Sequence, residues 1–212
     1  MVELSPELRK QIEQGIAILK RGGLVAYPTD TVYGLGASAA SREAVERVFQ
    51  AKSRPRDMAL PLLVASVAQI EELAGSISPI ARCLIDAFLP GVLTLVLRAS
   101  EAIPGYLKTA EGTVALRIPG HPIPIALIDG SGAPIVGTSA NLSGQPSPLT
   151  AEEVRSQLGD SVDLVIDGGR CPGRESTIVD VTGESPAVLR EGAISRQTIE
   201  RICTKTPSGR GR

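Results

Sequence analysis

The sequence contains no tryptophan, and aromatic residues make up only 2% of its 212 residues. A core built from this composition must be aliphatic, because few rings are available to fill it. Base stacking on aromatic side chains, which many proteins use to bind single-stranded nucleic acid, is disfavoured for the same reason. The formal net charge is −1 at pH 7, which argues against a protein that wraps nucleic acid without sequence preference.

Metal ligands and apolar segments of membrane length are equally scarce. The only histidine is His121, and the cysteines at 83, 171 and 203 match no CxxC spacing. We therefore expect no zinc site and no metal ion held by protein side chains. No stretch reaches the length of a membrane-spanning helix, and the N-terminus lacks the apolar segment of a secretory signal. These absences predict a cytoplasmic protein with no membrane partner.

Several serine and threonine residues mark expected helix starts. Ser5-Pro6, Ser41, Ser78-Pro79 and Thr150 stand where N-cap residues are preferred, ahead of segments with helical spacing of apolar residues. Further helices are expected at 67–74, 122–128 and 196–202.

Short apolar runs between these helices predict strands. The expected strands are 24–27, 60–65, 92–97, 113–118, 133–136, 162–166, 178–181 and 187–190. Strands and helices alternate without long linkers, which predicts one α/β domain with a mixed sheet over residues 1–203. Residues 204–212 are polar and basic, and we expect them to form a flexible tail.

The segment LVAYPTDTVYGLG, residues 24–36, is the first candidate for a binding site. Its apolar strand must leave the sheet at Pro28, and hydroxyls, one carboxylate and two glycines follow. Open α/β sheets place ligands at the carboxyl ends of strands, and glycine lets the backbone approach a ligand closely. Ordinary turn residues would explain the same pattern, so this segment by itself leaves both interpretations open.

Four cations stand at unusual places. Lys52 and Arg54 lie in a proline-containing loop, and Arg117 lies inside an otherwise apolar strand. Arg190 ends a second apolar strand in the same way. A cation within an apolar strand is costly unless it is paired or binds an anion. Structural salt bridges are one explanation, and a shared site for carboxylate and phosphate groups is the other.

Common catalytic motifs do not fit the remaining polar segments. Ser139-Ala140-Asn141 lacks the final glycine of G-x-S-x-G, and His121 precedes the serine instead of following it, which disfavours a serine hydrolase. The glycines at 34 and 36 lie too far from the preceding strand for a dinucleotide fingerprint, and no Walker motif occurs. His121 is expected to be a turn or capping residue. Ser176 and Thr177 are either ligand contacts or satisfied turn hydroxyls.

Six segments together resemble the YrdC-like family of threonylcarbamoyl-adenylate synthases, in its short, single-domain form. They occur in the family's order along nearly the whole chain: YPTDTVYGLG at 27–36, KSRP at 52–55, ALRIPGHP at 115–122, TSANLSG at 138–144, ESTIVD at 175–180 and LREG at 189–192. The resemblance implies a YrdC-like α/β fold, in which helices pack on a twisted, open, mixed sheet with a large concave, positively lined cleft.

The resemblance also implies a reaction, in which L-threonine, bicarbonate and ATP give threonylcarbamoyl-AMP and pyrophosphate with Mg²⁺. The implied partners are separate transfer proteins that modify tRNA, with tRNA itself as a further partner. By similarity, Lys52 and Arg54 would be the catalytic residues and hold the ATP phosphates. Threonine would be bound by Thr31, Arg117 and Ser176. The other implied nucleotide contacts are Thr113, Ser139, Asn141, Ser147 and Arg190.

The sequence departs from the family pattern at two positions after the K-x-R-P segment. Met58 and Leu63 stand where many relatives have asparagine and histidine. The contacts of that loop could then pass to Arg56 or Asp57. Two other functions remain as alternatives: a non-catalytic protein of the same fold that binds tRNA or double-stranded RNA, and a carbamoyl-adenylate step like that of hydrogenase-maturation domains.

Overall fold

The computed structural model describes residues 5–55 and 60–204. The expectations for Arg56, Asp57 and Met58, and those for the tail after Thr204, lie outside the described residues. Within these residues no helix is long and apolar enough to cross a membrane.

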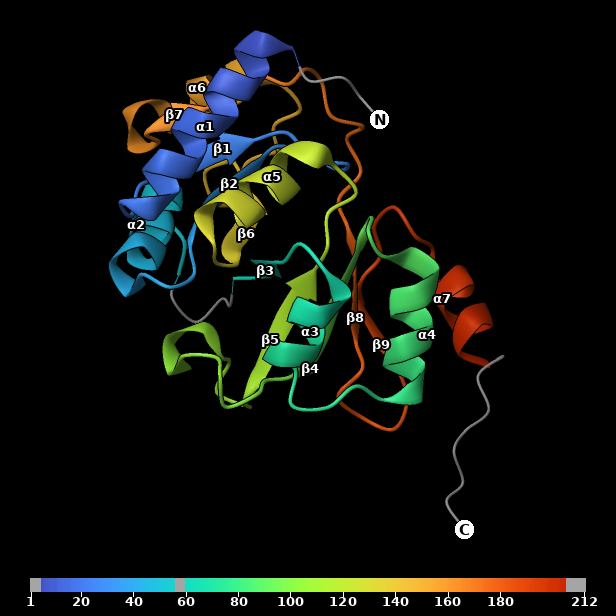
Figure 1. The fold of residues 1–212 in the computed structure, drawn as a ribbon. Coiled ribbons are helices and arrows are strands. Elements are labelled where there is room, and N and C mark those ends of the chain that lie inside the picture. The colour runs from blue at the N-terminus through green and yellow to red at the C-terminus, as the bar shows by residue number, and fades with distance from the viewer. Residues whose placement is uncertain (1–4, 56–59, 205–212) are drawn as a thin grey trace.

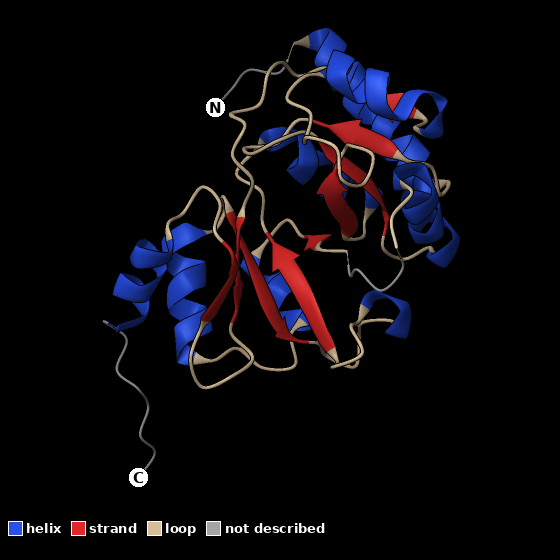
Figure 2. Ribbon diagram, turned by 180° about the vertical axis from the view of Figure 1, so that it is seen from behind, coloured by secondary structure: helices blue, strands red, loops and turns tan. Residues whose placement is uncertain are grey.

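A nine-stranded mixed sheet forms the centre of the molecule, with strand order β7-β1-β2-β6-β3-β5-β4-β8-β9. Three of its neighbouring pairs, β1–β7, β3–β5 and β4–β8, are parallel, and the other five are antiparallel. The strands are β1 Val25–Tyr27, β2 Gly34–Ser38, β3 Leu62–Leu63, β4 Leu93–Arg98, β5 Thr113–Arg117, β6 Ile135–Ser139, β7 Leu164–Val165, β8 Thr177–Asp180 and β9 Ala187–Arg190. The expected α/β fold with a mixed sheet is confirmed. Figure 2 shows the strong twist between the two halves of this sheet.

Helices cover both faces of the sheet (Figure 1). They are α1 Pro6–Lys20, α2 Arg42–Lys52, α3 Val67–Leu73, α4 Pro79–Phe88, α5 Pro122–Ser131, α6 Ala151–Leu158 and α7 Arg196–Thr204. The predicted caps at Ser5, Ser41, Ser78 and Thr150 are confirmed, because each side chain accepts a hydrogen bond from the backbone N–H three residues later. His121 caps α5, as expected: its Nδ1 accepts from the N–H of Ile123 at 3.3 Å.

Side chains of successive strand residues enter two separate hydrophobic clusters. Val25 and Tyr27 of β1 pack with α1 and α5 on one face of the sheet. Leu24 and Ala26 join the larger cluster on the opposite face. This alternation is the period-2 pattern of a strand buried on both sides. Leu63 of β3 and Ile135 of β6 belong to the same cluster as Val25 and Tyr27, so α1 and α5 cover this face beyond β1.

The structure corrects one interpretation of the glycines in the segment 24–36. Gly34–Ser38 is not an open loop but strand β2, which pairs antiparallel with β1 and β6. A Cβ atom at Gly34 or Gly36 would lie 2.9 Å from atoms of the Tyr27 side chain. The two glycines therefore make room for the Tyr27 ring on the sheet. Strand β6 similarly continues to Ser139, three residues beyond the expected end at 136.

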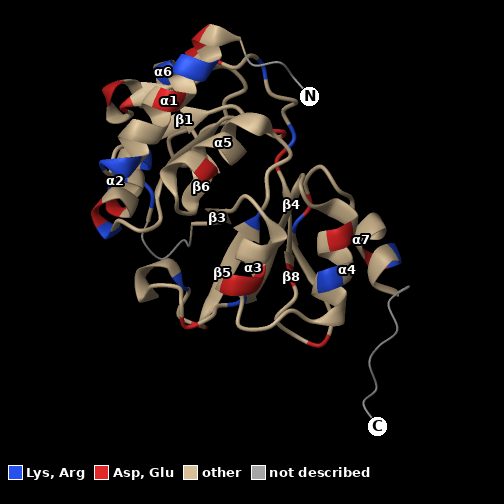
Figure 3. Ribbon diagram, viewed as in Figure 1, with Lys and Arg blue, Asp and Glu red and all other residues tan. Residues whose placement is uncertain are grey.

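Acidic and basic residues are mixed on the outer helices. Figure 3 shows both signs on α1, α2 and α4 in the same view. These helices therefore carry charges of both signs.

Candidate active site

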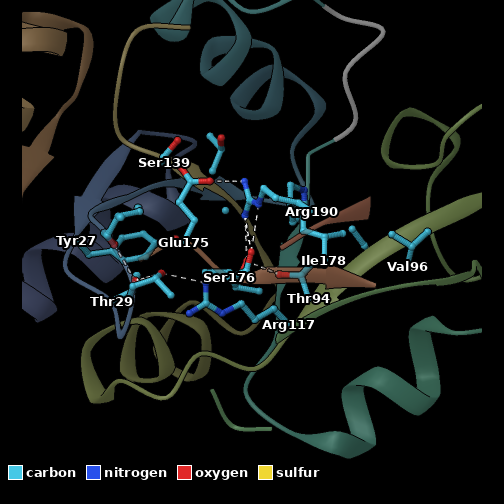
Figure 4. Close-up of a pocket in the computed structure, with 18 of the residues that line it drawn as sticks. Tyr27, Thr29, Thr94, Val96, Arg117, Ser139, Glu175, Ser176, Ile178 and Arg190 are labelled. Atoms are coloured by element: carbon cyan, nitrogen blue, oxygen red, sulfur yellow. Dashed lines mark hydrogen bonds and ion pairs between the residues drawn. The ribbon is translucent and has the colours of Figure 1, made fainter. Parts of the chain in front are cut away.

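A cavity of about 290 Å³ opens beside the hydrophobic cluster of α1 and α5, whose residues Tyr27 and Leu63 contribute to its lining. Strand residues that share this face alternate with core residues: Ala115 and Arg117 line the cavity, whereas Val114 and Leu116 are in the core. Strand pairing places Leu63 beside Arg117 and Gly34 beside Ser139. Of the residues predicted for the site, the lining includes Thr31, Arg54, Arg117, Ser139, Ser176 and Arg190. Figure 4 shows Arg117, Ser139, Ser176 and Arg190, which come from distant segments of the chain.

Arg117 is a buried cation with fixed partners. Its side chain is only 9% exposed, and Nη2 lies 2.5 Å from Oδ1 of Asp30. Nε donates to the carbonyl oxygen of Gly91 at 2.9 Å, and Nη1 donates to Oγ1 of Thr31 at 3.2 Å. Burial lowers the pKa of Arg117, and the Asp30 carboxylate opposes that shift. The structural salt bridge is therefore confirmed, and because Arg117 also lines the cavity, its binding of an anion stays a prediction.

A chain of hydroxyls orients Thr31 beside Arg117. Thr29 donates its hydroxyl proton to the carbonyl oxygen of Val32 at 2.7 Å. The contact of 2.8 Å between the hydroxyls of Thr29 and Thr31 must then be a donation from Thr31. Since Thr31 accepts from Arg117, one lone pair of its oxygen remains to accept from a ligand.

Arg190 belongs to a second polar group on the other side of the cavity. Its Nη1 lies 2.5 Å from Oε2 of Glu175, and Nη2 donates to the carbonyl oxygen of Ser176 at 3.0 Å. The Ser147 hydroxyl donates to Glu175 Oε1 at 2.6 Å. The hydroxyls of Ser176 and Thr94 lie 2.9 Å apart. The side chains of Arg190 and Glu175 are 44% and 37% exposed, so a ligand can reach them from the cavity.

Lys52 and Arg54 face different directions, although only one residue separates them. Ser53 adopts the left-handed conformation with φ 49° at the end of α2. Arg54 lines the cavity. Lys52 does not line it: the residue is 1% exposed, and Nζ donates to the carbonyl oxygens of Ser139 and Asn141. Burial and the neighbouring charge of Arg54 lower the pKa of Lys52 to about 8.

Three more predicted nucleotide contacts lie outside the cavity lining. Thr113 shares the face of Arg117 but is four residues away along β5, about 13 Å at the usual rise of a strand. Its hydroxyl contacts that of Thr109 at 2.8 Å. The Asn141 side-chain amide donates to the carbonyl oxygens of Leu142 and Gln145. The Ser147 hydroxyl donates a hydrogen bond to Glu175, which does line the cavity. Their nucleotide contacts stay predictions.

Other lining residues were not singled out from the sequence. Tyr27, Thr94 and Glu175 all border the cavity. Glu175 directly precedes Ser176 in one of the family segments, and Thr94 is a hydroxyl in an otherwise apolar strand, so both carried a signal. Tyr27 begins the family segment 27–36, and Asp30, which pairs with Arg117 beside the cavity, is the carboxylate of that segment, but no specific role was predicted for either residue.

Two acidic residues at the site form ion pairs with arginines. Asp30 pairs with Arg117, and Glu175 pairs with Arg190. Among residues 5–55 and 60–204, no group of three or more histidine, cysteine, aspartate or glutamate side chains could hold a metal ion. A site with three arginines, several hydroxyls and paired acids is suited to binding and orienting anions. Among the described residues that line the cavity, no hydroxyl group donates to a carboxylate or a histidine, so the lining offers no nucleophile with an adjacent general base.

Comparison with known proteins gives a consistent picture. Residues 17–192 match the Sua5/YciO/YrdC family, described as "Telomere recombination". A curated relative, threonylcarbamoyl-AMP synthase of Pyrococcus abyssi (strain GE5 / Orsay), is 42% identical over 201 residues, which cover 92% of this chain and 59% of the relative. A protein of Mycobacterium tuberculosis (strain CDC 1551 / Oshkosh) is 45% identical over 199 residues, covering 93% of this chain and 91% of that protein.

The solved structure of P. abyssi Sua5 complexed with L-threonine has the same fold. Its TM-score is 0.86 at 43% identity, with 90% of this chain and 56% of that chain covered. The chain thus spans little more than half the length of the P. abyssi protein.

Proposed function

This chain belongs to the Sua5/YciO/YrdC family, and we propose that it is a threonylcarbamoyl-AMP synthase, a nucleotidyltransferase that joins L-threonine, bicarbonate and the AMP part of ATP. The observation that carries the proposal is that the Thr31–Arg117 pair lines the same cavity as Arg54 and Arg190. The relatives support the substrates, because the P. abyssi relative is named a threonylcarbamoyl-AMP synthase and the P. abyssi Sua5 structure is complexed with L-threonine.

The proposed reaction needs positioning more than covalent catalysis. The threonine amine adds to the carbon of bicarbonate, water leaves, and a carbamate forms. A carbamate oxygen then attacks the α-phosphorus of ATP as the bond to the β-phosphate oxygen breaks, so that pyrophosphate leaves. Holding the reactants in line and neutralising the developing negative charge is the usual contribution of a protein to such transfers.

The threonine subsite is assigned to Thr31, Arg117 and Ser176. Arg117 has N–H groups beyond those that contact Asp30, Thr31 and Gly91, and these are suited to a carboxylate. The free lone pair on the Thr31 oxygen suits an N–H or O–H donor of the amino acid. Asp30 and Gly91 fix the plane of the guanidinium before the substrate arrives, which lowers the cost of ordering it on binding.

The phosphate subsite is assigned to Arg54 and Arg190, with Ser139 on the nucleotide side. Mg²⁺ prefers oxygen ligands and is commonly carried by substrate phosphates, so it would enter bound to the triphosphate rather than to Asp30 or Glu175. The product would pass, in the cytoplasm, to separate transfer proteins that modify tRNA.

The test is pyrophosphate release with each substrate omitted in turn. We expect release to require threonine, bicarbonate and ATP together. Arg117→Ala should lower kcat/KM for threonine and Arg54→Ala that for ATP, each by roughly tenfold to hundredfold, the usual cost of losing a charged hydrogen-bond partner. Arg82→Ala is the matched control, because Arg82 is a half-exposed arginine of α4 that pairs with Glu71 outside the cavity.

Two results would contradict the proposal. Release that is indifferent to threonine but supported by carbamoyl phosphate would indicate the carbamoyl-adenylate reaction instead. Tight, strongly salt-dependent tRNA binding without any ATP turnover would indicate an RNA-binding protein.

A further inference from the structure

We propose that Lys52 is a positioning residue: its ammonium group fixes the chain at 139–141 beside the cavity and does not itself hold the triphosphate. The inference deepens the proposed function, on which it rests, because it changes the role of one residue of the K-x-R-P segment. It follows from where the three protons of Lys52 go.

The hydrogen-bonding capacity of Lys52 is fully used inside the protein. An ammonium group has three N–H donors and no acceptor. Nζ lies 2.5 Å from the carbonyl oxygen of Ser139, 2.6 Å from that of Asn141 and 3.1 Å from Oδ1 of Asn141. Three donors thus meet three acceptors. A phosphate oxygen could be bound only if one of these bonds were broken.

The burial of Lys52 also indicates that its side chain does not contact a ligand in the cavity. Lys52 is 1% exposed and is not among the residues that line the cavity. Arg54, two residues later, does line it. The left-handed Ser53 between them turns the chain, so that the lysine points inward and the arginine points toward the ligand. Because the pKa of Lys52 is lowered only to about 8, the side chain is still protonated at neutral pH and keeps all three donors.

The segment that Lys52 holds is the one that carries Ser139 to the cavity. Two of its acceptors are the carbonyl oxygens of Ser139, the last residue of β6, and of Asn141, two residues beyond the strand. The third is the Asn141 side chain, whose amide group in turn bonds to the carbonyl oxygens of Leu142 and Gln145. The backbone of Lys52 takes part as well, since its carbonyl oxygen accepts from the N–H of Ser143 at 2.9 Å. One residue therefore organises the loop after β6.

The discriminating experiment compares the dissociation constants of AMP, ADP and ATP for the wild type and Lys52→Met. Methionine keeps the unbranched stem of the side chain up to the ε position and removes the ammonium donors. If Lys52 acts through the 139–141 segment, affinity for all three nucleotides falls by a similar factor, about tenfold. If Lys52 contacts the β- and γ-phosphates, the loss grows from AMP to ATP, and the proposal is overturned.

Two matched variants calibrate that comparison. Arg54→Met removes a cation that lines the cavity, and its loss should grow with the number of phosphates. Lys20→Met removes an exposed lysine at the end of α1 and should leave all three affinities unchanged. Asn141→Ala should mimic Lys52→Met, and the double variant should lose no more than the worse single one, because both act on the same loop.

Measurements without nucleotide separate this inference from the proposed function. In wild-type protein, acetylation of lysines read by mass spectrometry should leave Lys52 unmodified under conditions that modify Lys20, whether or not ATP is present. Amide hydrogen exchange should rise across residues 139–145 in Lys52→Met and not in Lys20→Met. If Lys52 reacts readily and ATP protects it, or if exchange is unchanged, the positioning role is wrong even if the enzyme is a synthase. If no nucleotide binds but both measurements hold, the proposed function fails and the role of Lys52 stands.

Discussion

Asp30 and Arg117, 87 residues apart in the chain, form a buried ion pair at the wall of the cavity, with Oδ1 and Nη2 at 2.5 Å. The aspartate follows β1 and the arginine ends β5, so the pair ties the turn after β1 to the middle of the sheet. Thr31 joins it through the second terminal nitrogen of the guanidinium group. The amino-acid subsite that we propose is built on this pair.

Asp30→Ala should destabilise the protein and weaken threonine binding together. Removing one partner of a buried pair leaves the other charge uncompensated, which costs about 3–5 kcal/mol. The side chains of Asp30 and Arg117 are 16% and 9% exposed, so little solvent screening is available. Urea denaturation gives the change in the free energy of unfolding, and calorimetry gives the threonine affinity. Glu71→Ala, which removes an exposed ion pair with Arg82, should cost about 0–1 kcal/mol; equal losses in the two variants would refute the buried-pair argument.

Gly36→Ala should be destabilising by about 1–3 kcal/mol, although alanine is a small residue. Its Cβ would lie 2.9 Å from two atoms of Tyr27 and 3.2 Å from the carbonyl oxygen of Val136. Adding Tyr27→Leu should recover part of the loss by removing the ring. The control is Gly105→Ala in the 3₁₀-helix Gly105–Leu107, where an added Cβ meets no atom within 4 Å. Thermal unfolding of the wild type and these three variants measures the differences, and a tolerated Gly36→Ala would show that the ring does not need this space.

Tyr27→Phe should leave the free energy of unfolding unchanged or raise it by up to about 1 kcal/mol. The Tyr27 hydroxyl is buried and has no hydrogen-bond partner among the described residues. Burial raises the pKa of Tyr27 well above its usual value, so the group stays neutral. Removing an unpaired polar atom relieves a desolvation cost instead of breaking a bond. A loss of more than 1 kcal/mol in urea denaturation would reveal a partner of this hydroxyl.

Lys52 should give stability a specific dependence on pH. Its pKa is lowered from 10.5 to about 8 in the folded protein, so between these values the unfolded chain binds more protons than the folded one. The free energy of unfolding contributed by this group therefore rises with pH from about 8 to 10.5. The difference between wild type and Lys52→Met, from denaturation curves at several pH values, should widen in favour of the wild type over that range. Parallel curves would contradict the shifted pKa.

The sequence by itself determined the elements that depend on local signals. Ser5, Ser41 and Thr150 cap helices because a hydroxyl three residues before a free N–H satisfies it, whatever the rest of the chain does. The apolar run Val92–Leu97 predicted a strand, and β4 forms at Leu93–Arg98. Aliphatic residues on both faces of a strand are buried when helices cover both faces of the sheet. Six ordered segments were enough to indicate the family, because each segment is a short contiguous stretch that can be recognised without the tertiary structure.

Only the tertiary structure decided where the side chains of the site point. Lys52 and Arg54 are equivalent cations in the sequence, yet one turns into the protein and the other into the cavity, because the acceptors of Lys52 lie 87 and 89 residues away. The segment Gly34–Ser38 has low strand propensity, but it forms a strand because β1 and β6 pair with it on either side. The Tyr27 ring occupies the space that side chains at positions 34 and 36 would fill. Such partners are supplied by distant segments, so local patterns carry no record of them.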